Sequence, residues 1–129
     1  MFWTIFNILT LRGTIMMRFL VYYTPGEAWI TGKTTNEQPY INPHALHIQN
    51  NFNAGKIIFA GPFEDHTGGA SILDVSSEEE AYQIINNDPL VMHHVVTAKL
   101  SPWEPIYNKQ ENSSPNFTKE FFESQGIII

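Results

Sequence analysis

Residues 56–75, KIIFAGPFEDHTGGASILDV, decide the fold of this chain. Two apolar runs, KIIFAGPF and GASILDV, are rich in β-branched and aromatic residues and therefore predict strands at 56–63 and 69–75. The five residues between them, EDHTG, have the length of a hairpin turn, so the two strands are expected to be antiparallel. The other elements can be placed around this hairpin.

Before the hairpin, the sequence predicts one strand and one helix. RFLVYY at 18–23 has the composition of a strand. In residues 42–54, Asn42 offers an N-cap and apolar side chains recur at helical spacing until Gly55, which predicts a helix. Residues 26–40 lack any periodicity and form a loop that is long for a small domain. Such loops often carry function.

After the hairpin, the sequence predicts a second helix and a fourth strand. Ser77 and Glu80 match a capping box, so a helix begins after Ser77, and Asp88-Pro89 ends it. VVTAKL at 95–100 predicts the last strand. The order βαββαβ predicts an α+β domain in which two helices pack on one face of a four-stranded antiparallel sheet.

The second face of the predicted sheet is also apolar. Because successive side chains of a strand point to opposite faces, each strand divides its apolar residues between the two faces. In strand 18–23, one face receives Phe19, Val21 and Tyr23, and the other receives Leu20 and Tyr22. In strand 56–63, one face receives Ile57 and Phe59, and the other receives Ile58 and Ala60. An exposed apolar patch of this extent usually marks an interface, so we expect a homodimer in which a second copy covers the open sheet face. The alternative is that segment 1–16 or segment 117–129 folds back over it.

Composition excludes several classes of partner. The 129 residues suffice for one domain, and the net charge is -6, with the seven Lys and Arg residues scattered along the chain. This charge pattern argues against nucleic acid or an anionic membrane surface as a partner. The absence of cysteine removes disulfides, thiol nucleophiles and thiolate metal sites, and is compatible with a reducing cytoplasm.

The two ends of the chain are expected to lie outside the domain. Residues 1–16 are largely apolar but lack the charge and the cleavage site of a signal peptide, and a helix spanning a membrane needs about 20 apolar residues. Met16-Met17-Arg18 has the appearance of a natural start, so 1–16 is interpreted as an extension or a mis-called beginning. The domain is then 17–107. Residues 108–129 are expected to be a loosely held tail with a short helix in FTKEFFES.

Histidines are the first candidates for chemistry, because imidazole changes charge near neutral pH. His44 falls in the first turn of helix 42–54, where the helix dipole disfavours imidazolium and leaves the ring neutral, as a general base requires. His47 could share a metal with His44, but no third ligand is indicated and a solvated helix face explains the pair equally well. No metal or cofactor is therefore expected. His93 and His94 are interpreted as strand-edge residues, with the alternative that one of them lines the pocket.

Among the carboxylates, Asp88 is the strongest candidate. Its position before a proline has a structural explanation, since Asp favours turns, and a functional one, in which it orients a histidine. Asp65 and His66 lie in the predicted hairpin turn, where turn chemistry explains them more simply than a site does. The sequence contains no nucleophile elbow, phosphate loop or dinucleotide fingerprint.

A series of short motifs in fixed order resembles a known family. The motifs are MRFLVYY, a histidine sixteen residues before AGP, GPFEDHTGG, a Ser-Glu-Glu-Ala helix start with one extra Glu (Ser77 to Ala81), Asp-Pro, and a last strand reaching Pro102-Trp103. From Met17 to about Tyr107 the chain thereby resembles the YCII-related domain, whose members are dimeric α/β barrels with a ferredoxin-like fold. The resemblance implies a homodimer, a pocket between the sheet and the helix ends, and a catalytic His-Asp pair, which carries over to His44 and Asp88.

Two functions remain open from the sequence. In the first, a small cytoplasmic enzyme of the lyase or isomerase kind uses His44 as a general base on a small organic acid, Asp88 orients His44, and Tyr23, Asp65 and His66 line the site. In the second, the protein is a non-catalytic dimeric module that binds a small ligand. The distance between the His44 ring and the Asp88 carboxylate discriminates between them, because a base needs its orienting group within hydrogen-bonding range.

Overall fold

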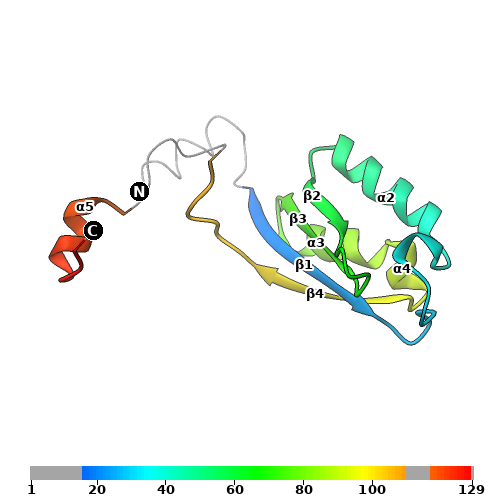
Figure 1. Ribbon diagram of the computed structural model, residues 1–129. Coiled ribbons are helices and arrows are strands. Elements are labelled where there is room, and N and C mark those ends of the chain that lie inside the picture. The colour runs from blue at the N-terminus through cyan, green and yellow to red at the C-terminus, as the bar shows by residue number, and fades with distance from the viewer. Residues whose placement is uncertain (1–15, 110–116, 129) are drawn as a thin grey trace.

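The computed structural model describes residues 16–109 and 117–128. The elements follow in the order β1 (Met17–Pro25), η1 (Thr35–Glu37), α2 (Ile41–Asn53), β2 (Ile57–Pro62), β3 (Gly69–Val75), α3 (Glu78–Asn86), α4 (Pro89–Met92), β4 (Val96–Pro102) and α5 (Lys119–Ser124). The four strands form one antiparallel sheet in the order β2-β3-β1-β4. Helices α2, α3 and α4 lie on one side of this sheet (Figure 1). The predicted α+β, ferredoxin-like arrangement is therefore confirmed.

The short helix α4 was not expected from the sequence. Asp88-Pro89 was interpreted only as the end of the preceding helix, and α3 does end at Asn86. The same two residues also begin α4, because the Asp88 carboxylate accepts a hydrogen bond from the Leu90 N–H and Pro89 occupies the first helical position. This second helix start holds Asp88 at a fixed place beside α2.

The caps of the two longer helices differ from the prediction in detail. Helix α2 begins after Tyr40, whose φ is 65°, and not after Asn42. His44 still lies in its first turn, with its N–H donating to the Tyr40 carbonyl at 3.1 Å. At α3, Ser77 Oγ accepts from the Glu80 N–H as predicted, but the Glu80 carboxylate accepts from the Ser76 N–H, one residue before the cap.

A β-bulge in β2 changes which side chains face the core. Ile57 is opposite Leu73, whereas Phe59 is opposite Ile72, so the register shifts between them and the two side chains point to opposite faces. The prediction that Ile57 and Phe59 share a face is wrong for this reason. Ile57 is 2% exposed beneath the helices, and Phe59 is 57% exposed at the other face.

The core lies between the sheet and helices α2, α3 and α4. Its sheet side is built from the inward positions of β1, which the alternation predicted to share a face, and from those of β3: Phe19, Val21 and Tyr23, with Leu73 and Val75. Its helix side comes from Ala81, Ile84, Ile85 and Leu90, all buried. Burying these side chains supplies the main favourable term for holding the helices on the sheet.

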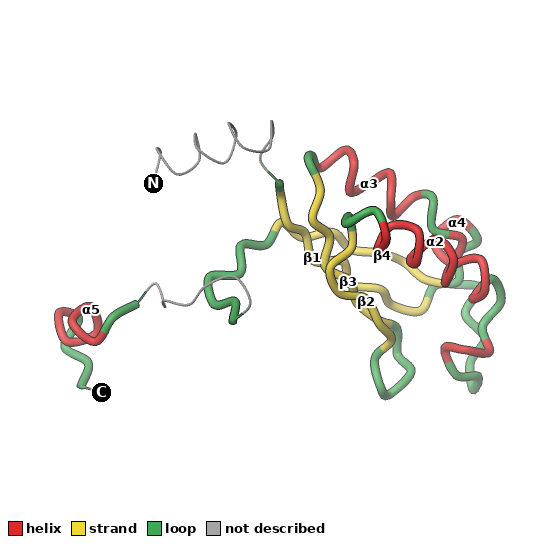
Figure 2. The backbone as a smooth tube through the Cα atoms, turned by 90° about the horizontal axis from the view of Figure 1, so that it is seen from above, coloured by secondary structure: helices red, strands yellow, loops and turns green. Residues whose placement is uncertain are grey.

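The open face of the sheet is apolar over three strands and polar over the fourth. Leu20, Tyr22, Phe59 and Ile72 share this face on β1, β2 and β3, whereas β4 contributes Thr97, Lys99 and Ser101. Helix α5, which the sequence predicted within 117–124, lies away from the sheet in both views (Figures 1 and 2). The described part of the tail thus leaves the open face uncovered. Residues 1–15 lie outside the described residues.

Among the helices of the described residues, none combines the length and the apolar character that a membrane crossing requires.

Candidate functional site

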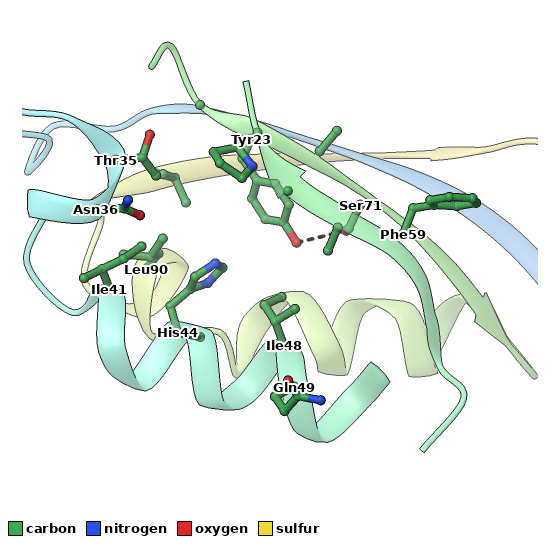
Figure 3. Close-up of a pocket in the computed structure, with 18 of the residues that line it drawn as sticks. Tyr23, Thr35, Asn36, Ile41, His44, Ile48, Gln49, Phe59, Ser71 and Leu90 are labelled. Atoms are coloured by element: carbon green, nitrogen blue, oxygen red, sulfur yellow. Dashed lines mark hydrogen bonds between the residues drawn. The ribbon is translucent and has the colours of Figure 1, made fainter. Parts of the chain in front are cut away.

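A cavity of about 570 Å³ opens between the sheet and α2 (Figure 3). Most of its wall is apolar, and aromatic side chains from the β1–α2 loop and from the end of α2 contribute to it: Trp29 and Phe52. Polar side chains also line it: Tyr23 of β1, His44 and Gln49 of α2, Ser71 of β3, and Thr35 and Asn36 of η1. The cavity has the apolar lining and the few polar groups that are typical of small-molecule sites.

His44 and Asp88 meet at the bottom of this cavity, where the first turn of α2 faces the start of α4. The Nδ1 atom of His44 lies 2.8 Å from Oδ1 and 2.9 Å from Oδ2 of Asp88. Asp88 is 1% exposed, and its Oδ1 also accepts the Leu90 N–H at 3.0 Å. A buried carboxylate needs such partners, because an unpaired charge away from water is costly.

This geometry determines the tautomer of the neutral His44 ring. An ionised carboxylate only accepts hydrogen bonds, so Nδ1 carries the hydrogen and Nε2 keeps its lone pair. No described residue forms a hydrogen bond with Nε2. The ring projects into the space below Tyr23 (Figure 3), so the lone pair is available to a ligand. The arrangement can therefore accept a proton at Nε2 while Asp88 stabilises the resulting charge.

Tyr23 supplies a hydroxyl group on the opposite wall. Its oxygen lies 3.3 Å from Ser71 Oγ, and the two side chains come from neighbouring strands (Figure 3). Burial raises the pKa of Tyr23 to about 12; the hydrogen bond with Ser71 lowers the pKa by less, and the negative charge of Asp88 raises it further. Tyr23 therefore remains protonated at neutral pH and can act as a hydrogen-bond donor.

Asp65 and His66 are not among the residues that line the cavity. Both lie exposed in the hairpin turn, where Asp65 Oδ1 accepts from Thr67 Oγ1 at 2.6 Å and from the Thr67 N–H at 3.1 Å. These two hydrogen bonds lower the pKa of the Asp65 carboxyl group. Of the predicted site residues, the structure thus brings together Tyr23, His44 and Asp88 and leaves the hairpin pair at a distance.

The other histidines have partners elsewhere. His47 Nε2 donates to the Ile84 carbonyl at 2.8 Å and so joins α2 to α3. His93 ends α4 and stacks on the Tyr40 ring at 3.8 Å between centroids; neither His93 nor His94 is in a strand, so their interpretation as strand-edge residues is wrong. Within 16–109 and 117–128, no three potential metal ligands are grouped together.

Sequence reasoning missed Ser71 as a member of the site. Its signal was present in GASILDV, where alternate residues face the helices and Ser71 is the polar one between Gly69 and Leu73. The β1–α2 loop, which was singled out from the sequence for its length, contributes to the site as well. Hydrogen bonds from the Gly26 N–H to the Val95 carbonyl and between the Gln38 side chain and the Ile30 backbone hold it as a wall of the cavity.

Comparison with known proteins identifies a shared fold. No family model and no curated protein matches the sequence. Among solved structures, the chain is similar to 5-chloro-2-hydroxyhydroquinone dehydrochlorinase (TftG) from Burkholderia phenoliruptrix AC1100, in complex with 2,5-dihydroxybenzoquinone. The match has 21% identity and a TM-score of 0.52, and covers 74% of this chain and 100% of that one. Identity this low shows the fold alone, and the resemblance to the YCII-related domain stays a prediction.

Proposed function

We propose that this protein is a small cytoplasmic enzyme of the YCII-related kind, acting as a lyase or isomerase on a small cyclic compound. One observation carries the proposal: both oxygens of Asp88 hold Nδ1 of His44, while Nε2 faces a mostly apolar cavity without a partner among the described residues. A base oriented by a buried carboxylate is a recurring arrangement for proton transfer. The solved neighbour, named as a dehydrochlorinase and carrying a cyclic ligand, supports a ring compound as the substrate.

The proposed step is a proton abstraction. Nε2 takes a proton from the bound compound, and the electron pair of the broken bond moves into its ring system. Asp88 stabilises the imidazolium that forms, as the corresponding carboxylate does in catalytic triads. In an isomerisation the proton returns to another ring atom, and in an elimination the electron pair expels a leaving group. In either outcome His44 is the base and Asp88 is the group that orients it.

The test is whether the protein converts ring compounds or only binds them. Full-length protein is incubated with a panel that includes 5-chloro-2-hydroxyhydroquinone and 2,5-dihydroxybenzoquinone, and products are followed by chromatography and chloride release. We expect conversion of at least one member of the panel. Binding of panel members without any conversion contradicts the proposed enzyme and favours a ligand-binding module, the second function that the sequence left open.

We further propose that a second copy of the chain covers the open sheet face. Support comes from Tyr22 and Phe59, two large exposed side chains beside the half-buried Leu20 and Ile72. Patches of this kind usually mark an interface. The face is thus suited to a symmetric homodimer, in which the same residues meet across a two-fold axis.

Sedimentation velocity at micromolar concentration tests the dimer. We expect the mass of two chains for the wild type and of one chain for Phe59→Lys, because a charge within the patch would be buried on association. Tyr82→Lys is the matched control, since Tyr82 is an exposed aromatic residue on α3, at the opposite face. A monomeric wild type overturns the proposal.

A further inference from the structure

Two buried hydroxyl groups stand together on the sheet side of the cavity, among positions that are otherwise apolar. Tyr23 and Ser71 are 8% and 1% exposed, and their oxygens are 3.3 Å apart. Both lie on the inward side of the sheet with Val21 and Leu73, whose side chains belong to the core. A hydroxyl pair costs more to bury than the aliphatic side chains beside it. Its presence here calls for an explanation beyond packing.

The Tyr23 and Ser71 hydroxyl groups together carry two hydrogens, and the hydrogen bond between them uses only one. Each hydroxyl group has one hydrogen and two lone pairs, so when one donates to the other, the second hydrogen remains. No further side-chain partner of either hydroxyl is found among the described residues. Because both groups line the cavity, the remaining hydrogen is available to an acceptor atom of a ligand (Figure 3).

The charges around the cavity limit what that acceptor can be. Among the described residues that line it, none is Lys, Arg, Asp or Glu. His44 is the lining side chain that can become a cation, and Asp88 already balances that charge. A carboxylate or phosphate ligand would therefore lose its hydration without meeting an unbalanced positive charge, which is unfavourable. An uncharged, flat compound is compatible with the aromatic walls provided by Trp29 and Phe52. The organic acid expected from the sequence is therefore replaced by a neutral ring compound.

Resting on the proposed function, we infer that the Tyr23–Ser71 pair binds the oxygen atom of a neutral ring substrate, namely a phenol, a quinol or a cyclic enone. His44 removes a proton from that oxygen or from a ring atom conjugated to it. If a C–H bond breaks, its proton goes to Nε2 and its electron pair moves through the ring onto the oxygen; if the O–H bond of that oxygen breaks, the proton goes to Nε2 and the electron pair stays on the oxygen. The hydroxyl pair donates its unused hydrogen to this oxygen as negative charge develops there. Donors placed in this way stabilise the charged state more than the neutral one.

The probe is 4-nitrophenol, whose phenol and phenolate forms absorb at different wavelengths, so that binding and ionisation are read together. For the wild type we expect bound probe with an increased phenolate fraction. In Tyr23→Phe, and to a smaller extent in Ser71→Ala, we expect the dissociation constant to rise about tenfold and the phenolate fraction to fall, since a hydrogen bond to a charged group is lost. Tyr82→Phe, which removes an exposed hydroxyl on α3, should leave both readouts unchanged.

The contradicting results are specific to this inference. Wild-type protein that does not bind 4-nitrophenol, binds 4-nitrobenzoate at least as well, or is unaffected by Tyr23→Phe overturns it. Circular dichroism and the melting temperature of each variant show whether the fold is retained, and Ser71→Ala provides a second variant if Tyr23→Phe fails to fold. If Tyr23→Phe weakens binding but the panel shows no conversion, the oxygen site stands and the proposed enzyme fails.

Discussion

Replacing Asp88 with Asn should leave the protein folded and reduce turnover by up to about 10⁴-fold, the loss known for an Asp→Asn change beside a catalytic histidine. The side-chain oxygen of the introduced asparagine can still accept the Leu90 N–H and cap α4. Its amide nitrogen, however, would take the place of Oδ2, 2.9 Å from Nδ1 of His44, so a donor replaces one of the two acceptors and the negative charge beside the ring is lost. Nε2 would then be a weaker base, because nothing stabilises the imidazolium that forms when it takes a proton.

Replacing Asp88 with Ala should impair folding as well as turnover. The helix cap is lost, and the His44 Nδ1–H and the Leu90 N–H are left without an acceptor in a buried place. Together these losses should lower the free energy of unfolding by about 2–4 kcal/mol, measured by urea denaturation. Asp74→Asn is the matched control, because its half-buried carboxylate makes a 3.8 Å ion pair with Arg18, and such pairs are worth at most about 1 kcal/mol. An Asp88→Asn variant with wild-type turnover would contradict this role.

Replacing Gly68 with Ala should lower the free energy of unfolding by at least about 2 kcal/mol, because a side chain is strained there and has no space. Gly68 has a φ of 132°, a region that residues with a side chain rarely adopt. A Cβ atom on Gly68 would collide with the Tyr23 carbonyl oxygen and lie 2.9 Å from the carbonyl carbon. The added methyl group therefore displaces β1 at Tyr23, whose hydroxyl group lines the cavity. We expect the variant to bind ring compounds more weakly as well as to be less stable.

Gly61→Ala is the matched control for this substitution. Gly61 lies in β2 across the same hairpin, and a Cβ atom there would have no described atom within 4 Å. Its change in the free energy of unfolding should stay within about 1 kcal/mol of zero. Equal denaturation midpoints for Gly68→Ala and the wild type would show that the hairpin turn accommodates a side chain at residue 68. That result would contradict the prediction that Gly68 is needed to keep Tyr23 in place.

The order of strands and helices could be predicted because each carries a local signal. Residues 69–75 form a mostly apolar run after a glycine-containing turn, and the structure has a strand at Gly69–Val75. Two features escaped prediction for physical reasons. The run from Ile57 to Ala60 is apolar at every position, so no alternation reveals the bulge. Asp88-Pro89 both ends α3 and begins α4, and only the second role explains the Leu90 hydrogen bond.

The site was harder to predict because its parts are distant along the chain. His44 and Asp88 each had a reason to be candidates, but no local pattern places residues 44 positions apart at 2.8 Å. The two residues are close because α2 packs against α4. This contact could not be predicted, since α4 itself was not expected from the sequence. Ser71 went unnoticed for a related reason: its importance depends on Tyr23, which lies on the adjacent strand.

The most direct test of the central claim is the turnover rate of His44→Asn relative to wild type, on a compound that the wild type converts. Asn retains an N–H donor for Asp88 but has no atom equivalent to Nε2, so the variant removes the base and keeps the buried carboxylate paired. We expect the rate to fall at least about 10²-fold, the size of a general-base contribution, with little change in melting temperature. His47→Gln, on the same helix and outside the cavity, should retain the wild-type rate. A His44→Asn variant that turns over as fast as the wild type would contradict the account.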